Sequence, residues 1–207
     1  SPVRLRSFNK RYNPTSNISF GFNYQLRPNY SRNISRASIG YSWNNSVKIK
    51  QILTPVNINF VKVNPTPEFE KILEEETNKR LKEQYSDHMI LGLNYSIIFS
   101  NQETTGLKNF EYFRANIETS GNLLYGLNSL FGSSKSPEGY YELVGVRYSQ
   151  YVRADFDFRQ YYMMKNRKSS LATRIYVGLG LPYLNSEEIP YERGFYAGGA
   201  NGMRGWA

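Results

Sequence analysis

The 207-residue chain contains no cysteine and a single histidine, His88. Without cysteine it can form neither a disulfide scaffold nor a thiolate metal site. His88 has no second histidine or cysteine with which to build a transition-metal site. The chain also lacks a Gly-x-Ser-x-Gly nucleophile elbow and a phosphate-binding loop. We therefore expect no catalysis, no cofactor and no bound metal.

Long apolar runs are missing as well. No stretch approaches the roughly 20 apolar residues that a membrane-spanning helix needs, which argues against a helical membrane protein. The chain begins Ser-Pro-Val-Arg without a secretory signal, so we expect a processed or truncated N-terminus.

The net charge of +9 could indicate a nucleic-acid partner. The basic residues do not form a patch, however. They stand singly at alternate positions or near turns, as in residues 165–168. We expect no nucleic-acid partner.

What the chain does contain is aromatic side chains in period-two patterns. It has 18 Tyr, 12 Phe and 2 Trp, and apolar residues alternate with polar ones in seven stretches, which predicts strands. The predicted strands are residues 17–26, 33–43, 50–62, 87–100, 110–121, 148–162 and 170–181. In the clearest stretch, Val152, Ala154, Phe156 and Phe158 alternate with Arg153, Asp155, Asp157 and Arg159, and Arg174 lies on the polar face of the last one.

One segment departs from this pattern. Residues 66–86 are predicted to be a helical insertion, because Phe69, Ile72 and Leu81 recur at helical spacing. Acidic residues precede basic ones, as the helix dipole favours, and Pro67 suits a first turn. The insertion is expected in an extended loop between two strands.

The strand lengths favour a membrane barrel over a soluble β-sandwich. Strands of a soluble sandwich usually have about five or six residues and a charged outer face, whereas these have about ten or more. Their polar faces mix charge with Asn, Ser and Gly, as in a hydrated barrel interior. Short turns at 44–46 and 165–168 alternate with long loops, including 122–139. We predict an all-β, antiparallel transmembrane β-barrel, of which seven strands are only a part.

The end of the chain carries the most specific motif. A Phe-x-x-Gly-Gly stretch begins at Phe195, and an arginine-glycine tetrad follows in residues 203–206. This pattern resembles the signature of the outer-membrane assembly and translocation barrels that include BamA, TamA and the two-partner secretion transporters. The nearer likeness is to the TamA-like surface-antigen lipoproteins of Bacteroidetes-type outer membranes. The residues that match by type are Phe195, Gly198, Gly199, Arg204 and Gly205, while Met203 and Trp206 replace the usual β-branched and Phe/Tyr residues.

The resemblance implies that residues 1–207 are the middle of a sixteen-strand barrel, about strands five to eleven. N-terminal POTRA domains and the final strands would lie outside this chain. Residues 184–207 would be the motif-bearing loop that folds back into the barrel, where its arginine meets an acidic residue on a later strand. A guanidinium in a barrel lumen needs a carboxylate partner. The lumen-facing charged candidates within the chain are Arg153, Asp155, Asp157, Arg159 and Arg174, of which Arg153 and Arg159 could already neutralise the two aspartates.

The function that the resemblance implies is non-enzymatic assembly, insertion or translocation of proteins at the Gram-negative outer membrane. The implied partners are outer-membrane lipids, client outer-membrane proteins and periplasmic or lipoprotein accessory subunits. Two alternatives stay open: a porin or passive transporter whose charged lumen selects solutes, and a soluble sugar-binding β-domain.

Overall fold

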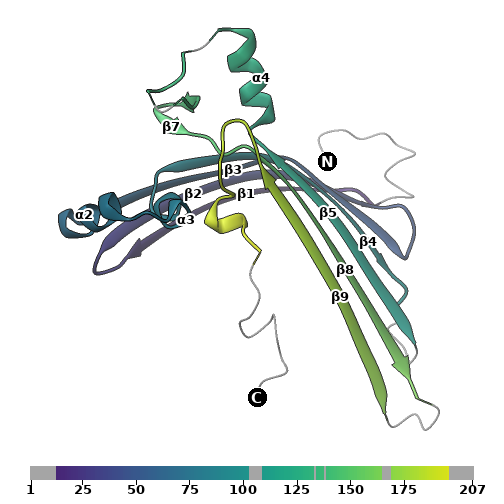
Figure 1. The fold of residues 1–207 in the computed structure, drawn as a ribbon. Helices are drawn as coiled ribbons and strands as arrows, with labels where there is room; N and C mark the ends of the chain where they lie inside the picture. The colour runs from purple at the N-terminus through teal and green to yellow at the C-terminus, as the bar shows by residue number, and fades with distance from the viewer. Residues whose placement is uncertain (1–12, 103–108, 133, 138, 165–168, 196–207) are drawn as a thin grey trace.

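The structure, a computed structural model, describes residues 13–102, 109–132, 134–137, 139–164 and 169–195. Seven long strands form one antiparallel sheet in the order β1-β2-β3-β4-β5-β8-β9, which curves strongly around one side (Figure 1). β1 and β9 are its two edges, so the sheet is open. The strands are β1 Thr15–Leu26, β2 Tyr30–Asn44, β3 Ile49–Pro65, β4 His88–Ser100, β5 Phe110–Ser120, β8 Tyr151–Met163 and β9 Ser170–Pro182.

All seven predicted strands are confirmed, with ends that shift by a few residues. The register between β3 and β4 shifts between Thr54 and Asn57, a stretch that contains Pro55. No helix in the described part of the chain is long and apolar enough to cross a membrane.

The insertion between β3 and β4 contains two helices where the sequence predicts one: α2 Pro67–Glu75 and α3 Lys79–Gln84. The break has a local cause. The Glu76 carboxylate accepts hydrogen bonds from the backbone N–H groups of Thr77 and Asn78, both at 2.9 Å. The Asn78 side chain then accepts from the backbone N–H of Leu81 at 3.3 Å. These side chains satisfy backbone groups that a continuous helix would otherwise pair.

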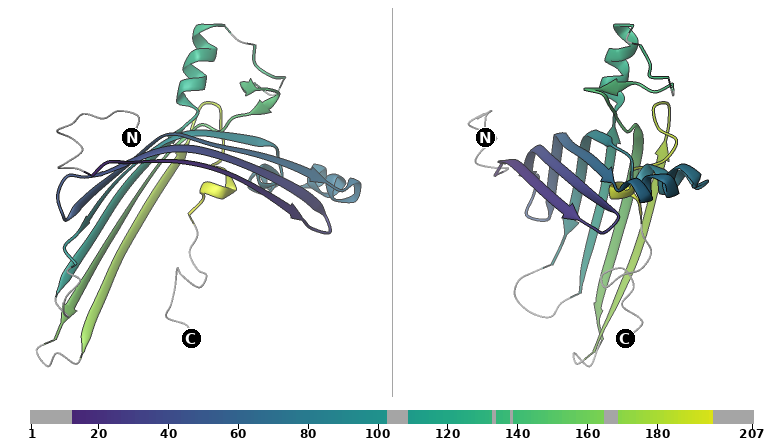
Figure 2. Two further views of the ribbon diagram at one scale, coloured as in Figure 1. Left: turned by 180° about the vertical axis from the view of Figure 1, so that it is seen from behind. Right: turned by 90° about the vertical axis from the view of Figure 1, so that its left-hand side faces the viewer.

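The expectation of a plain loop at residues 122–139 is wrong. The segment begins with helix α4, Asn122–Leu130, and a small hairpin of β6 Glu142–Leu143 and β7 Val146–Arg147 follows. Gly121 precedes α4 with φ +76°, and a Cβ there would lie 2.7 Å from the carbonyl oxygen of Ser149. Only glycine fits this junction without strain. The long insertions lie at one end of the sheet (Figure 2).

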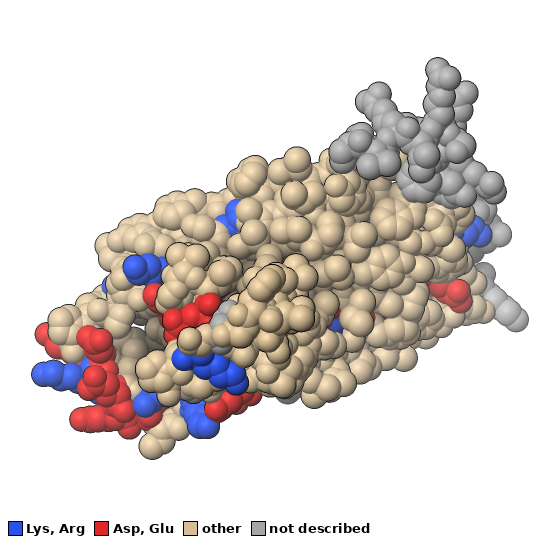
Figure 3. Space-filling view, turned by 90° about the horizontal axis from the view of Figure 1, so that it is seen from above, with Lys and Arg blue, Asp and Glu red and all other residues tan. Residues whose placement is uncertain are grey.

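The sheet exposes its apolar side chains on one face and buries charged side chains on the other, which is the reverse of the arrangement in a soluble protein. The apolar side chains that alternate along the strands are exposed: Phe156 is 40% exposed and Val177 is 59% exposed. On the opposite, concave face, Asp157 is 1% exposed and Glu118 is 2% exposed. Figure 3, seen from above, shows charged side chains gathered around the helical insertion, with few over the rest of the visible surface. The side assignment predicted from alternation is therefore confirmed.

Candidate functional site: the concave face and the loop after β9

The chain after β9 turns back beneath the sheet, and the short 3-10 helix η1, Tyr191–Arg193, lies on the concave side (Figures 1 and 2). This returning segment, residues 184–195, is the described part of the predicted motif-bearing loop. We call it the return loop. It carries two apolar side chains, Ile189 and Phe195, and two charged side chains, Glu192 and Arg193, that contact the wall of the sheet. Its first residues are held by a separate set of hydrogen bonds.

Asn185 fastens the start of the return loop. It is 2% exposed, and its side-chain oxygen accepts a hydrogen bond from the backbone N–H of Tyr141 at 2.7 Å. Its amide donates to the carbonyl oxygens of Tyr141 and Tyr148, both at 2.9 Å. All three bonds join the loop to the segment around β6 and β7. The return loop therefore leaves β9 in a fixed direction.

Glu118 of β5 is the buried carboxylate that receives the far end of the return loop. It accepts a hydrogen bond from the hydroxyl of Tyr151 at 2.7 Å. Arg193 of η1 forms an ion pair with it at 3.2 Å, and Arg153 of β8 forms a second at 3.6 Å. The Glu118 side chain is only 2% exposed. A carboxylate this buried is stable as an ion only with such partners.

Glu192 makes a separate attachment to the opposite part of the wall. Its carboxylate lies 3.1 Å from Nε2 of His88 in β4 and 3.7 Å from Arg32 in β2. The Nδ1 atom of His88 lies 3.0 Å from the carbonyl oxygen of Ser86. Both ring nitrogens thus face oxygen acceptors, an arrangement that only the imidazolium satisfies fully. Adjacent loop residues therefore bind opposite charges on different strands.

Burial and pairing act in opposite directions on the Glu192 carboxyl. Burial raises its pKa, but the hydrogen bond and charge of His88, together with the charge of Arg32, outweigh that effect. The pKa of Glu192 therefore lies below the ordinary glutamate range. Glu192 is an anion at neutral pH, and its charge holds η1 against the wall.

Phe195, the one described residue of the predicted motif, packs on bare backbone. A Cβ at Gly178 of β9 would lie 2.5 Å from the Phe195 ring, so the ring occupies the space that a side chain would fill. The guanidinium carbon of Arg153 lies 4.2 Å from the ring centroid, within cation–π range. Arg153 thus contacts both Phe195 and Glu118. The other motif residues lie outside the part of the chain that the structure describes; they are Gly198, Gly199, Met203, Arg204, Gly205 and Trp206.

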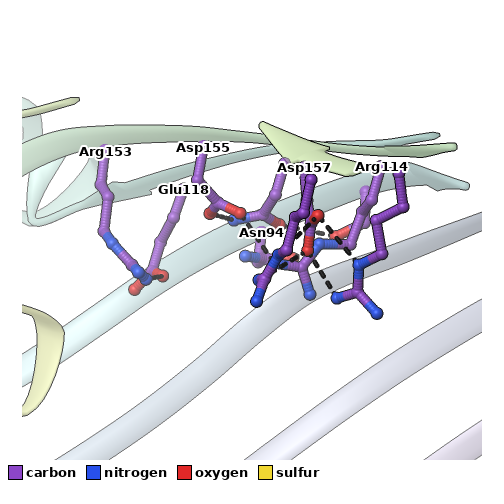
Figure 4. A network of polar contacts seen from close by, with 10 residues as sticks. Asn94, Arg114, Glu118, Arg153, Asp155 and Asp157 are labelled. Carbon is purple, nitrogen blue, oxygen red and sulfur yellow. Dashed lines mark hydrogen bonds and ion pairs between the residues drawn. The ribbon is translucent and has the colours of Figure 1, made fainter. Parts of the chain in front are cut away.

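The predicted lumen-facing charges do share the concave face, where they form ion pairs partly with one another and partly with other residues of the wall (Figure 4). Asp157 binds Arg159 at 2.7 Å and Arg174 at 2.9 Å, which confirms the expected pairing with Arg159. The pairing expected for Arg153 is wrong. Asp155 instead binds Arg114 at 2.9 Å, because that guanidinium lies on the neighbouring strand.

The sequence pattern does not identify Glu118 as part of a site, nor does it identify Glu192, Arg193 and Arg32. The partners of Glu118 lie up to 75 positions away along the chain, and Glu192 in η1 pairs with Arg32 in β2. No local sequence pattern reveals contacts between residues so far apart in the chain. The available signal is a group of charged and aromatic residues, Glu192, Arg193 and Phe195, that stands a few positions before the glycine pair. Such residues are unusual in a flexible loop.

The contacts on this face are ion pairs, hydrogen bonds and a cation–π contact. Its buried carboxylates are neutralised by arginine or histidine, and a polar hollow of about 360 Å³ remains beside η1, lined partly by Arg36, Asn57 and Asn59. Within the described ranges, no group of three His, Asp or Glu side chains could hold a metal ion. The arrangement is suited to holding a loop in place by charge.

Docking of the return loop should depend on pH through Glu192. Because its pKa is lowered, the ionised form stabilises the docked loop at neutral pH, and this contribution is lost as the pH falls through the lowered pKa. We expect protease protection of residues 184–195 to hold at pH 5–7 and to weaken below about pH 4. A Glu192→Gln variant should be less protected at neutral pH and show a flatter profile. Identical profiles for the two proteins would contradict the assignment.

Gly178 should be required for Phe195 to dock. A Gly178→Ala substitution places a methyl group where the ring lies, which we expect to cost about 1–3 kcal/mol of docking free energy. Gly21→Ala is the matched control, since a Cβ there meets only the Cβ of Arg36 at 3.9 Å. Proteolysis of the return loop measures the effect. Equal protection of the two variants would show that the ring does not depend on this gap.

No curated protein and no solved structure matches the chain. A family model described as the Omp85 superfamily domain matches residues 4–207. This match covers nearly the whole sequence, and it agrees with a long-stranded antiparallel sheet whose final described loop returns to the polar face. The chain belongs to the Omp85 superfamily.

Proposed function

We propose that this chain is the central part of a BamA/TamA-like outer-membrane barrel that inserts or translocates other proteins without catalysing a reaction. Omp85 superfamily membership implies outer-membrane protein insertion or translocation in general. The proposal adds the barrel, with these seven strands as about the fifth to the eleventh of sixteen, and the likeness to TamA-like surface antigens.

The observation that carries the proposal is the docking of the return loop on a polar wall. All three charged or aromatic residues of the loop contact the concave face: Glu192 contacts β2 and β4, Arg193 contacts β5, and Phe195 contacts β8 and β9. A loop that only connected two strands would gain nothing from burying charges in this way. We infer that the loop braces the barrel lumen, and that Arg204, further along the same loop, adds a latch to a carboxylate on a later strand.

The exposed face of the sheet supports a lipid environment. Apolar side chains such as Phe156 and Val177 remain open to the surroundings across a wide surface, and soluble monomers rarely expose patches of this extent. Strands of 11 to 17 residues exceed the roughly 9–11 residues that a tilted strand needs to cross a bilayer. We infer that this face contacts outer-membrane lipid.

The working mechanism in this proposal is strand pairing. Client outer-membrane proteins would enter at a weak seam between the first and last strands, where a client strand adds to an exposed edge by backbone hydrogen bonds. The braced loop would keep the lumen side of the barrel rigid while the seam opens. Periplasmic or lipoprotein accessory subunits would deliver clients to the seam.

A passive pore is the second candidate, because the charged groups on the concave face would also select ions. The pairing of these charges argues against it. Asp155 and Asp157 are both ion-paired with arginines, so these charges are held in contacts within the wall. A pore function predicts steady conductance of the reconstituted protein that does not depend on the loop.

Replacing Arg204 by Ala in the full-length protein should lower client insertion while the barrel still folds. Removing the guanidinium leaves its carboxylate partner unpaired, which costs about 3 kcal/mol of loop docking. Insertion of a client into vesicles measures activity, heat-modifiable migration reports folding, and Lys71→Ala on the exposed α2 helix controls for lost charge. Full insertion activity together with an unchanged pattern of loop proteolysis would overturn the proposed role.

A further inference from the structure

Helix α4 presents an apolar stripe that nothing in the described part of the chain covers. Leu130 is 82% exposed and Phe131 is 81% exposed, and Leu123 and Leu127 are 70% and 41% exposed. With 100° of rotation per residue, these four positions fall within a stripe about 100° wide. Tyr125 on the opposite side of the helix, and Leu124 beside the edge of the stripe, pack against the cluster of Met89, Val146 and Tyr148.

The position of α4 links it to the exposed face of the sheet. The cluster beneath the helix includes Met89 of β4 and Phe60 of β3, which are paired neighbours. In strand alternation, Met89 shares its side with Leu91 and Leu93, and Leu93 is 40% exposed. The first turn of the helix therefore packs at the end of the apolar face, and the helix projects from the end of the sheet where the long insertions begin (Figure 2). Gly121 fixes it there, because its junction with β5 tolerates no side chain.

The sequence of this segment is free of charge. No Asp, Glu, Lys or Arg occurs between Glu118 and Lys135. The other insertion is the reverse, because α2 carries acidic residues in its first turn and exposes Glu74 and Glu75. A helix that lies near an apolar sheet face and exposes an apolar stripe without nearby charges can bury that stripe at a membrane interface, although it lacks the basic polar face of many interfacial helices.

We propose that α4 lies at the outer boundary of the bilayer and buries Leu123, Leu127, Leu130 and Phe131 in lipid. This inference rests on the proposed function, which places the apolar face of the sheet in the membrane. The occupant of the stripe is then the lipid surface itself, continuous with the lipid around β4 and β5. Asn122, Gly126 and Ser129 fall on the remaining side of the helix and face water.

The absence of cysteine from these residues allows a direct test. Single cysteines at Leu130 and Ser129 place an environment-sensitive nitrobenzoxadiazole probe on adjacent residues that point in different directions. The full-length protein is reconstituted in phosphatidylcholine vesicles that contain lipid spin-labelled near the headgroup. We expect the Leu130→Cys probe to be quenched by the spin label more than about twofold better than the Ser129→Cys probe, because the stripe reaches the headgroup and acyl boundary. Aqueous iodide should give the reverse order.

Two further probes separate this inference from the proposed function. Val177→Cys reports on the apolar face of β9, and Ile72→Cys reports on the charged helix α2. If the Val177 probe is quenched by lipid but the Leu130 probe responds only to iodide, α4 is not a membrane helix, and its stripe is left for a protein partner. If the Val177 probe also responds only to iodide, the bilayer placement of the sheet fails. The Ile72 probe should follow the aqueous quencher, and lipid quenching there would show that exposure alone explains a signal at Leu130.

Discussion

The buried carboxylate of Glu118 is the interaction on which the arrangement of this chain depends. It joins three segments, because its partners Tyr151 and Arg153 belong to β8 and Arg193 belongs to the return loop. Burying the charge costs several kcal/mol unless its partners are in place. The wall therefore favours the docked loop, and the docked loop in turn makes the buried charge tolerable. Arg153 extends the coupling, since it also lies against the Phe195 ring.

Reversed polarity makes this coupling strong. In a soluble sheet the inner face excludes charge, but here the inner face is polar and its carboxylates are buried. Charges in such a place interact more strongly than at an open surface. Glycine has a matching role on the wall, because Gly178 leaves room for Phe195 against the backbone. The apolar side chains of the outer face are exposed, and the proposed lipid environment would bury them.

The strands and their faces were predictable from sequence because alternation is a local property. Each of the seven stretches carries its own period, and Asp157 and Phe156 follow from it directly. The break between α2 and α3 could not be predicted, because it depends on hydrogen bonds between the backbone and side chains such as that of Glu76. Helix α4 was not predicted either, because the glycines in and around it favour a loop. The contacts of Glu118 and Glu192 could not be predicted, because they form between strands whose register and curvature no single segment encodes. The motif indicated a loop that folds back, and the structure places its first residue, Phe195, on the wall.

The central claim is that Glu118 and Arg193 stabilise the docked loop as a pair, and a double-mutant cycle tests it most directly. Glu118→Gln, Arg193→Gln and the double variant are compared in the full-length protein by the free energy of loop opening, measured from hydrogen exchange of residues 184–195. The account predicts that the two changes are not additive, with a coupling of about 1–3 kcal/mol. Changes that add to within about 0.5 kcal/mol would contradict it, because independent residues behave in that way.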